Sequence, residues 1–505
     1  MKKIDAFLNK ITMYRAVLYS LLLLLVAAIG LSFFKLLPFG PLDLMVSTIF
    51  ITAVCFTSNA VFAWAFKAPS NVDSVYITAL ILALIITPPK AFNNLLFLTF
   101  ISIVAMASKY IFAVGRKHFL NPVAVSVALV GLVANQSASW WVANLYMMPF
   151  VVIGGLLVVR KIKRFDLVLS FFAVVLLTGS IFSLVNGQNL LSGLVRALLY
   201  SPMLFFAFIM LTEPMTLPPT RMLRIVYGLI AGFLFVPQIH IGSLYFTPEL
   251  ALILGNVFTY LVSPDKKLIL KLDKIINLTP DTYDFVFTPD QKMNFKPGQY
   301  MELTLDHPSQ DSRGIRRYLT IASSPTEKEF RFGVKFYNKA SSFKKTLIQM
   351  KQDQEIVASQ LAGDFTLPQD KNKKLVFIAG GIGITPFRSM IKYMLDKKEK
   401  RTVTLLYANW TQNDIAYKNI FNEAENQLGM KTVYSCAKTP TVLPDGHRCR
   451  GLLKEQDIIE EIPDYKERLF YISGPPSMVK AFEGYLKNIG VKKKNVVTDY
   501  FPGFS

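Results

Sequence analysis

The first 264 residues of the chain contain ten apolar runs separated by short polar connections, and no other feature constrains the fold as strongly. The first run, residues 16–37, is long enough to cross a hydrocarbon core of about 30 Å. Ten such runs are difficult to reconcile with the buried core of a soluble protein. The sequence therefore predicts a polytopic α-helical membrane domain of about ten spans. The runs lie at residues 16–37, 42–66, 72–88, 93–114, 121–135, 144–159, 167–186, 191–212, 222–238 and 243–263.

Basic residues recur in every second connection between these runs. Cytoplasmic loops of membrane proteins carry the excess of lysine and arginine, so we expect these connections and the basic N-terminal segment to face the cytoplasm. An even number of spans then places residues 265–505 in the cytoplasm too. The prediction is a multi-pass protein of the cell (inner) membrane with both termini cytoplasmic. The basic residues concerned are Lys67, Arg116, Lys117, Arg160, Lys161, Lys163, Arg164, Arg221, Arg224, Lys266 and Lys267.

The pattern changes at Leu268, where short segments such as "GQYMELTL" and "FRFGVKFY" begin to alternate with turn residues. Period-2 segments of this kind predict antiparallel strands, here a small barrel. After "AGDFTLP" the chain alternates between strand-like and helix-like segments, as a Rossmann-like α/β domain does. We therefore expect three domains: a transmembrane domain at residues 1–264, a β-barrel at 265–370 and an α/β domain at 371–505.

A glycine-rich turn lies between a strand and a helix in the segment "KLVFIAGGIGITPFRSM". Free N–H groups and the dipole at a helix N-terminus favour a bound phosphate, so this arrangement predicts a nucleotide site. The net charge of +21 is not accompanied by an aromatic-basic cluster, and nucleic acid is not expected as a partner. Cys55, Cys436 and Cys449 lack C-x-x-C spacing, which predicts neither a disulfide framework nor a thiolate metal site.

Six motifs follow one another in the second half of the chain: "FKPGQYMEL" (295–303), "RRYLTIASSP" (316–325), "NKASSF" (338–343), "GGIGITP" (380–386), "YISGPPSM" (471–478) and the terminal "DYFPGF" (499–504). On these motifs and their order, residues 268–505 resemble the ferredoxin–NADP reductase superfamily, in which a flavin-binding barrel precedes a nicotinamide-nucleotide lobe. The resemblance implies an NAD(P)H-dependent flavin oxidoreductase that binds FAD and either NADH or NADPH.

This resemblance implies roles for individual residues. Arg317 is expected at the flavin pyrophosphate, and Thr320 near flavin N5 as the catalytic residue. The position of the stacking aromatic falls on Leu319, with Tyr318 on the opposite face of the strand, which leaves Phe501 or Phe504 as an alternative stacking ring. The implied FAD-binding residues are Arg317, Tyr318, Leu319, Thr320, Ile321, Ala322, Ser323, Lys339, Ser341, Ser342, Phe501 and Phe504.

The nucleotide is expected to lie between the two glycine-containing loops. The run "YANWTQND", with Trp410 and Asp414 in place of an arginine or lysine, favours NADH over NADPH. The residues implied for this site are Gly380, Gly381, Gly383, Ile384, Thr385, Pro386, Gly474 and Pro475.

The first half resembles the membrane flavin subunits NqrB and RnfD, on the segments "RKHFLNPVAVS" (116–126) and "LTEPMTLPPTRMLRIVYGLIAG" (211–232). The resemblance implies a second flavin, FMN or riboflavin, within the membrane domain. The chain lacks the S-G-A-T stretch to which the family links FMN, so we expect noncovalent binding. The implied contact residues are His118, Asn121, Thr212, Glu213 and Thr216.

The two resemblances together predict a transmembrane oxidoreductase. Electrons would pass from cytosolic NAD(P)H through FAD and the membrane flavin to an extracytoplasmic flavin or flavoprotein. The alternatives are a one-sided membrane NAD(P)H:quinone reductase and a component of a redox-driven cation pump. Stacked hemes are not expected, because His118 and His240 lie at opposite ends of spans, about 30 Å apart. No metal site is predicted.

Overall fold

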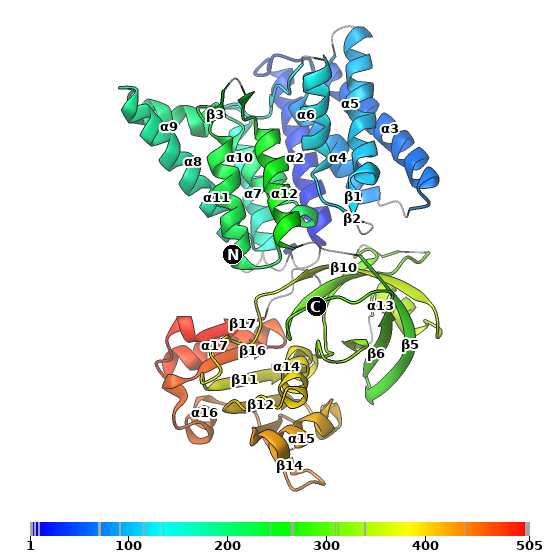
Figure 1. Ribbon diagram of the computed structural model, residues 1–505, viewed down its shortest axis with the longest axis vertical. Coiled ribbons are helices and arrows are strands. Elements are labelled where there is room, and N and C mark those ends of the chain that lie inside the picture. The colour runs from blue at the N-terminus through cyan, green and yellow to red at the C-terminus, as the bar shows by residue number, and fades with distance from the viewer. Residues whose placement is uncertain are drawn as a thin grey trace. The chain divides into compact units, whose positions relative to one another are not determined.

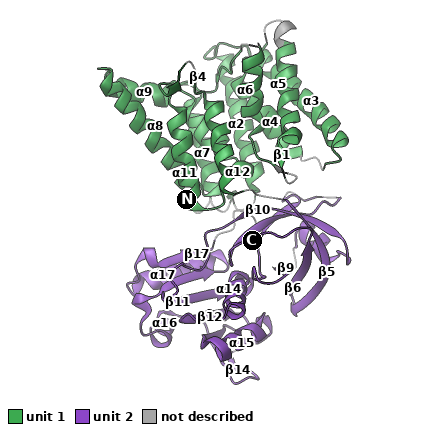
Figure 2. Ribbon diagram, viewed as in Figure 1, with its two compact units in different colours: residues 1–266 green, residues 267–505 purple. Residues whose placement is uncertain are grey.

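The computed structural model divides the chain into two compact units, residues 1–266 and 267–505 (Figure 2). It describes the chain except for residues 1–3, 5–6, 9–10, 69–71, 90–91, 115–116, 135, 243, 264–266, 309, 312, 338–339, 439 and 500–505, and the side chains of residues 92–94, 117, 134 and 244. Each unit has its own secondary structure.

The first unit is helical, and a helix lies in each of the ten apolar runs of the sequence (Figure 1). Polar caps begin some of these helices: the Thr12 hydroxyl accepts a hydrogen bond from Arg15 N, and that of Thr247 from Leu250 N. The helices are α2 (Met13–Phe33), α3 (Pro41–Ala65), α4 (Val72–Ile85), α5 (Phe92–Ile111), α6 (Pro122–Ala134), α7 (Met148–Ile162), α8 (Phe165–Val185), α9 (Leu190–Leu199) with α10 (Met203–Phe205), α11 (Arg221–Phe235) and α12 (Pro248–Val262).

Helix length separates these elements into two groups. Among the described residues, α2, α3 and α8 are long and apolar enough to cross a membrane, and α9 with the segment Met203–Met210 would add a fourth span bent by 58°. A helix of 14 residues such as α4 rises only about 21 Å, at about 1.5 Å per residue. The N-terminal unit therefore has candidate membrane spans, whereas the count of ten spans stays a prediction.

Helices α8 and α11 approach closely at two glycines. A Cβ atom on Gly228 would lie 2.8 Å from the carbonyl oxygen of Leu167, and one on Gly232 would lie 2.8 Å from that of Phe171. After α10 the chain forms a π-helical turn, η1 (Phe206–Met210), and a 3-10 turn, η2 (Pro214–Thr216). Two short hairpins, β1 (Ala113–Val114) with β2 (Lys117–His118) and β3 (His240–Ile241) with β4 (Leu244–Tyr245), complete the unit.

The second unit begins with a six-stranded antiparallel sheet in the order β8-β7-β10-β5-β6-β9. Alternating apolar residues, including Phe285, Phe287 and Phe332, form the core on one face of this sheet. The predicted antiparallel strands are therefore present, and their closure into a barrel stays a prediction. The elements are β5 (Leu268–Thr279), β6 (Thr282–Pro289), β7 (Tyr300–Thr304), β8 (Arg316–Thr320), β9 (Phe330–Lys335), α13 (Ser342–Ile348) and β10 (Glu355–Ala362).

A seven-stranded sheet follows in the order β14-β15-β13-β12-β11-β16-β17, parallel except for the β14–β15 pair. Helices α14 and α15 pack on one face, through Phe387 and Phe421, and α16 and α17 on the other, through Ile458 and Phe482 (Figure 1). The strands are β11 (Leu375–Gly380), β12 (Val403–Asn409), β13 (Lys431–Cys436), β14 (Thr441–Val442), β15 (Arg448–Arg450), β16 (Leu469–Ser473) and β17 (Val496–Thr498), and the helices are α14 (Thr385–Asp396), α15 (Lys418–Leu428), α16 (Glu455–Glu461) and α17 (Pro476–Asn488).

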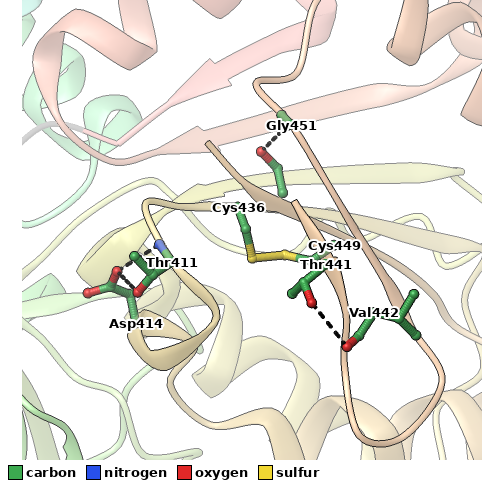
Figure 3. The surroundings of a disulfide bond; sticks show 8 residues. Thr411, Asp414, Cys436, Thr441, Val442, Cys449 and Gly451 are labelled. Atoms are coloured by element: carbon green, nitrogen blue, oxygen red, sulfur yellow. Dashed lines mark hydrogen bonds between the residues drawn. A yellow bond between two sulfur atoms is a disulfide. The ribbon is translucent and has the colours of Figure 1, made fainter. Parts of the chain in front are cut away.

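Cysteine spacing did not predict a disulfide, but the structure joins Cys436 to Cys449 (Figure 3). The two cysteines are 13 residues apart in sequence, yet β13 and β15 are neighbours in the sheet and bring their Cα atoms to 5.5 Å. That separation lies within the usual range for a disulfide. Cys55 is buried and free.

Candidate active site

The two predicted nucleotide loops are in contact at the carboxyl end of the seven-stranded sheet. A Cβ atom on Gly383 would lie 2.6 Å from Gly474 Cα, and one on Gly380 would lie 3.1 Å from Pro475 Cδ. Gly381 has a φ of +51° and open space around the position of its Cβ. The space beside Gly381 is thus open, whereas Gly380 and Gly383 are tightly packed. The carboxyl edge of such a sheet is where ligands of α/β folds bind.

Helix α14 starts directly from this turn. Thr385 and Pro386 form its first turn, and the Thr385 hydroxyl donates to the carbonyl of Ile382 at 3.2 Å. Proline in the first turn removes an N–H group that the helix does not use. Ile384 is buried beneath the turn. The remaining N–H groups at the helix start can bind an anion such as a pyrophosphate.

Strand pairing decides which side chains share a face of the six-stranded sheet. Thr320 of β8 is opposite Tyr300 of β7, and Tyr318 is opposite Glu302. Residues two apart on a strand share a face, so Arg316, Tyr318 and Thr320 lie on one face. The rings of Tyr318 and Tyr300 meet edge-on, with centroids 5.7 Å apart.

Arg317 and Leu319 lie on the other face. Nη1 of Arg317 donates to the carbonyl oxygens of Arg313, Gly314 and Arg316 at 2.8, 3.1 and 2.6 Å. The guanidinium carbon lies 5.1 Å from the centroid of the Phe343 ring. Burial lowers the pKa of Arg317 to about 10. Arg317 is therefore a buried cation that orders the loop before β8, and not a solvated surface charge.

Arg316 and Glu302 were not among the predicted site residues. The Glu302 side chain is 2% exposed, and its Oε1 lies 3.6 Å from Nη1 of Arg316. Both residues share the face of Thr320 and Tyr318. The doublet "RR" together with strand alternation was the signal that could have found Arg316, whereas Glu302 depends on the register of β7 against β8.

Thr320 is buried, and its hydroxyl has no hydrogen-bond partner among the residues that the structure describes. A buried hydroxyl normally has a partner. Together with Arg316 on the same face, this hydroxyl fits a flavin whose ring would supply the missing partner. The residues at this face could therefore hold FAD.

The segment after β8 is held by backbone and side-chain hydrogen bonds. Ile321 N donates to the carbonyl of Gln299 at 3.0 Å, Ala322 N to that of Arg331 at 2.7 Å, and Arg331 N to Ser323 Oγ at 3.2 Å. All three predicted residues of this segment are buried. The segment is therefore fixed in place beside Thr320.

Ser341 and Ser342 lie at the start of α13. The Ser341 hydroxyl accepts from Lys344 N at 3.3 Å, and Ser342 Oγ accepts from Asp311 N at 3.1 Å. Burial, and then the charges of Arg317 and Arg313, lowers the pKa of Lys344 to about 8. This turn therefore has desolvated cations beside it. Three predicted residues, Lys339, Phe501 and Phe504, lie outside the described residues.

In the first unit, two predicted residues from distant segments meet. Asn121 Nδ2 donates to Glu213 Oε2 at 2.6 Å, although 92 positions separate them. Asn121 N donates to Asn256 Oδ1 at 2.8 Å, and Asn256 Nδ2 donates to the Tyr227 hydroxyl at 3.0 Å. Asn256 and Tyr227 were not predicted. A polar amide within an apolar run was the signal that could have found Asn256, whereas the contact of Tyr227 depends on helix packing.

The other predicted membrane residues flank this polar cluster in sequence. The Thr212 hydroxyl donates to the carbonyl of Phe208 at 2.7 Å, and that of Thr216 to the carbonyl of Glu213 at 3.5 Å. His118 belongs to β2, three residues before Asn121, and is opposite Ala113 of β1 in the short hairpin. The structure therefore brings Asn121 and Glu213 together and places His118 in the hairpin that precedes Asn121.

A family model matches part of each half of the chain. Residues 377–484 match the family model described as the oxidoreductase NAD-binding domain, and residues 144–265 match that of the NQR2, RnfD, RnfE family. Both resemblances are confirmed. The second unit contains an NAD-binding oxidoreductase domain, and the predicted class, an NAD(P)H-dependent flavin oxidoreductase, is confirmed at the level of this domain.

Two curated relatives each cover about two fifths of the chain. A flavohemoprotein from Bacillus cereus is 27% identical over 218 residues, which is 41% of this chain and 53% of the relative. One from Burkholderia sp. is 29% identical over 212 residues, 41% of this chain and 52% of the relative. The chain thus spans about half the length of these relatives. Among solved structures, a cytochrome P450 reductase from Amycolatopsis has 22% identity and a TM-score of 0.42, covering 46% of this chain and 69% of that one.

Proposed function

We propose that this protein is a transmembrane flavin oxidoreductase. It takes electrons from cytosolic NAD(P)H through FAD in the second unit and a flavin in the first unit to an extracytoplasmic flavin or flavoprotein. The observation that carries the proposal is the presence of both family matches in one chain. A reductase that served only the inner face would need one or two anchoring helices, and not a domain of the NQR2, RnfD, RnfE kind.

Residues of the second unit have distinct tasks in this proposal. The backbone at Gly380, Gly381 and Gly383 and the start of α14 bind the nucleotide pyrophosphate. Arg317 orders the loop before β8, and Arg316 lies on the face of β8 where FAD would bind. The Thr320 hydroxyl would donate a hydrogen bond near flavin N5. When bound, FAD accepts two electrons at once and releases them singly. The protein contributes binding, orientation and the exclusion of water.

The loop after β12 supports NADH as the electron donor. Asp414 Oδ2 accepts hydrogen bonds from Thr411 N at 2.9 Å and Thr411 Oγ1 at 2.8 Å, and Oδ1 lies 3.4 Å from Lys335 Nζ. This carboxylate is fixed in the loop where a family member that binds NADPH would hold the 2′-phosphate. Residues 410–414 of this loop contain no arginine or lysine that could hold such a phosphate.

The cluster of Asn121, Glu213, Asn256 and Tyr227 supports a noncovalent flavin, FMN or riboflavin, in the first unit. Polar side chains are costly within a membrane domain and indicate functional sites. Amide and carboxylate groups can bind the polar edge of a flavin, which carries both donors and acceptors. His118, Thr212 and Thr216 belong to the same proposed site.

Proteoliposomes test the direction of electron flow. The protein is oriented with its second unit outside, and a flavin acceptor that cannot cross the bilayer is trapped inside. NADH added outside should reduce the trapped acceptor. Glu213→Gln and Thr216→Val should abolish that reduction while the FAD still turns over.

Glu249→Gln is the control, because Glu249 is another acid of the first unit, is buried, and accepts from Trp140 Nε1 at 2.8 Å. This variant should behave as the wild type. A trapped acceptor that stays oxidised while FAD turns over would favour a one-sided NAD(P)H:quinone reductase. Reduction that depends on sodium or on a proton gradient would favour a component of a redox-driven cation pump.

A further inference from the structure

Side chains in the first two turns of helix α14 donate hydrogen bonds to the segment that follows β8. Arg388 Nη1 donates to the carbonyl oxygen of Ala322 at 2.9 Å, and the Ser389 hydroxyl donates to that of Ser323 at 2.6 Å. Both donors follow Thr385 within four residues. Side chains of the nucleotide helix therefore hold the backbone that leaves the proposed flavin strand.

Glu327 strengthens this connection from the side of the six-stranded sheet. Both terminal nitrogens of Arg388 contact its carboxylate, with Nη2 donating to Oε1 at 2.9 Å. The same carboxylate accepts from Ser324 N at 2.6 Å. The paired geometry fixes the direction of the guanidinium as well as its distance. The turn of residues 322–327 is thus held at both ends by one arginine.

A second layer of contacts supports the arginine. Its guanidinium carbon lies 5.6 Å from the centroid of the Tyr417 ring, and the Tyr417 hydroxyl donates to Asp284 Oδ1 at 3.0 Å. Asp284 belongs to β6 and pairs with Arg331 of β9 at 3.1 Å. The connection therefore extends to strands β6 and β9 of the six-stranded sheet.

Gly333 of β9 shows how closely this sheet approaches the nucleotide turn. A Cβ atom there would lie 2.7 Å from Thr385 Cγ2 and 2.7 Å from the Tyr417 hydroxyl. No side chain fits at that position without displacing the turn. The nucleotide turn and the sheet thus have one close-packed relative position, which Arg388 and Ser389 secure.

We propose that Arg388, assisted by Ser389, is a positioning residue for hydride transfer. The inference rests on the proposed function, in which one hydride with its two electrons passes from the nucleotide to the flavin and a proton comes from water. Arg388 acts through Ala322 and Ser323 and through the start of α14. Reacting atoms must come within about 3–3.5 Å of each other, and a displacement of about 1 Å can cost about 100-fold in rate.

Arg388→Met removes the connection, and Arg401→Met is its matched control. The side chains of both arginines are 4% exposed. Arg401 also has one glutamate partner and one backbone carbonyl, with Nε at 2.6 Å from Glu399 and Nη1 at 3.0 Å from the carbonyl of Asp370. Its partners do not belong to the segment after β8. The two variants should therefore lose similar thermal stability.

The first measurement needs no cofactor. Amide hydrogen exchange at residues 320–327 of the FAD-free protein should accelerate in Arg388→Met and stay at the wild-type rate in Arg401→Met. The second measurement is anaerobic stopped-flow reduction of bound FAD by NADH and by 4-deuterated NADH. In Arg388→Met we expect the limiting rate constant to fall about 10-fold or more, with FAD content and nucleotide affinity nearly unchanged. Arg401→Met should keep the wild-type rate constant.

Wild-type reduction kinetics in Arg388→Met, or equal slowing in Arg401→Met, would overturn the proposal. If Arg388→Met fails to fold or to retain FAD, Ser389→Ala decides, because it removes one hydrogen bond and no charge. Wild-type exchange and kinetics in Ser389→Ala would then count against positioning. If neither NADH nor NADPH reduces the wild-type protein, the proposed function fails, and the exchange experiment still reports whether Arg388 holds the segment.

Discussion

Thr320 is a buried threonine whose hydroxyl lacks a hydrogen-bond partner among the described residues. Leaving a buried polar group unsatisfied costs about 1–3 kcal/mol. Thr320→Val keeps the shape of the side chain and removes this group. The FAD-free protein should therefore be at least as stable as the wild type, by thermal unfolding.

The same variant should reduce FAD about 10-fold more slowly, because one hydrogen bond is worth about 1–1.5 kcal/mol. Stopped-flow reduction by NADH measures the effect, and Thr320→Ser should restore the rate. A Thr320→Val protein that is destabilised without FAD and reacts at the wild-type rate would contradict a role at the flavin.

Lys344 should make the affinity of the proposed site for FAD depend on pH. Burial, followed by the charges of Arg317 and Arg313, lowers its pKa to about 8. In the FAD-free protein Lys344 is thus charged below about pH 8 and neutral above it. A bound diphosphate favours the charged form and raises this pKa, so binding above pH 8 requires proton uptake.

FAD affinity should therefore be constant below about pH 8 and weaken above it, by up to about tenfold per pH unit. Fluorescence titration of FAD between about pH 7 and 9.5 measures the slope. Lys344→Met should lose the slope, while Lys345→Met, at the exposed neighbouring position, should keep it. A flat profile in the wild type would place the diphosphate away from Lys344.

At the scale of elements, the sequence predicted the ten helical segments and both sheets from apolar periodicity, because that signal is local. It did not predict the break between α9 and α10, where run 191–212 bends by 58°. A proline disfavours the helical conformation of the residue before it, and Pro202 follows Ser201 at this break. The glycine loops could also be predicted from local sequence, since the strand, the turn and the helix are consecutive.

Contacts between segments that are distant in sequence could not be predicted from local patterns. Glu302 lies on the face of Thr320 because of the register of β7 against β8. Arg388 contacts Ala322 because of the way α14 packs in the second unit. Asn256 meets Asn121 across 135 positions. Register and helix packing depend on the whole unit, and a single sequence carries little information about either.

The disulfide between β13 and β15 makes a prediction for these elements. Closing a loop of this size stabilises the folded state by about 3 kcal/mol. Dithiothreitol should therefore lower the melting temperature of the second unit by about 6–12 °C. Cys436→Ser should abolish this effect of reductant, while Cys55→Ser should keep it. Disulfides are rare in the cytosol, so alkylation in intact cells should find both thiols reduced.

At the scale of the whole molecule, the proposed electron path needs the nucleotide site on the cytoplasmic side. The basic connections of the sequence support that orientation. Protease added outside intact cells should leave residues 267–505 uncut, because the bilayer separates them from the enzyme. Immunoblotting of a tag at the C-terminus measures the outcome.

The test needs a positive control on the outer side. The connection between α8 and α9 contains exposed residues around Gly187 and Gln188, and an inserted protease site there should be cut from outside. The same site inserted after Lys163, in a connection predicted to be cytoplasmic, should be cut only after the cells are opened. Both insertions must leave FAD content unchanged for the comparison to hold. Cleavage after Lys163 in intact cells would reverse the topology, and NADH from the cytosol could then not reach the glycine loops.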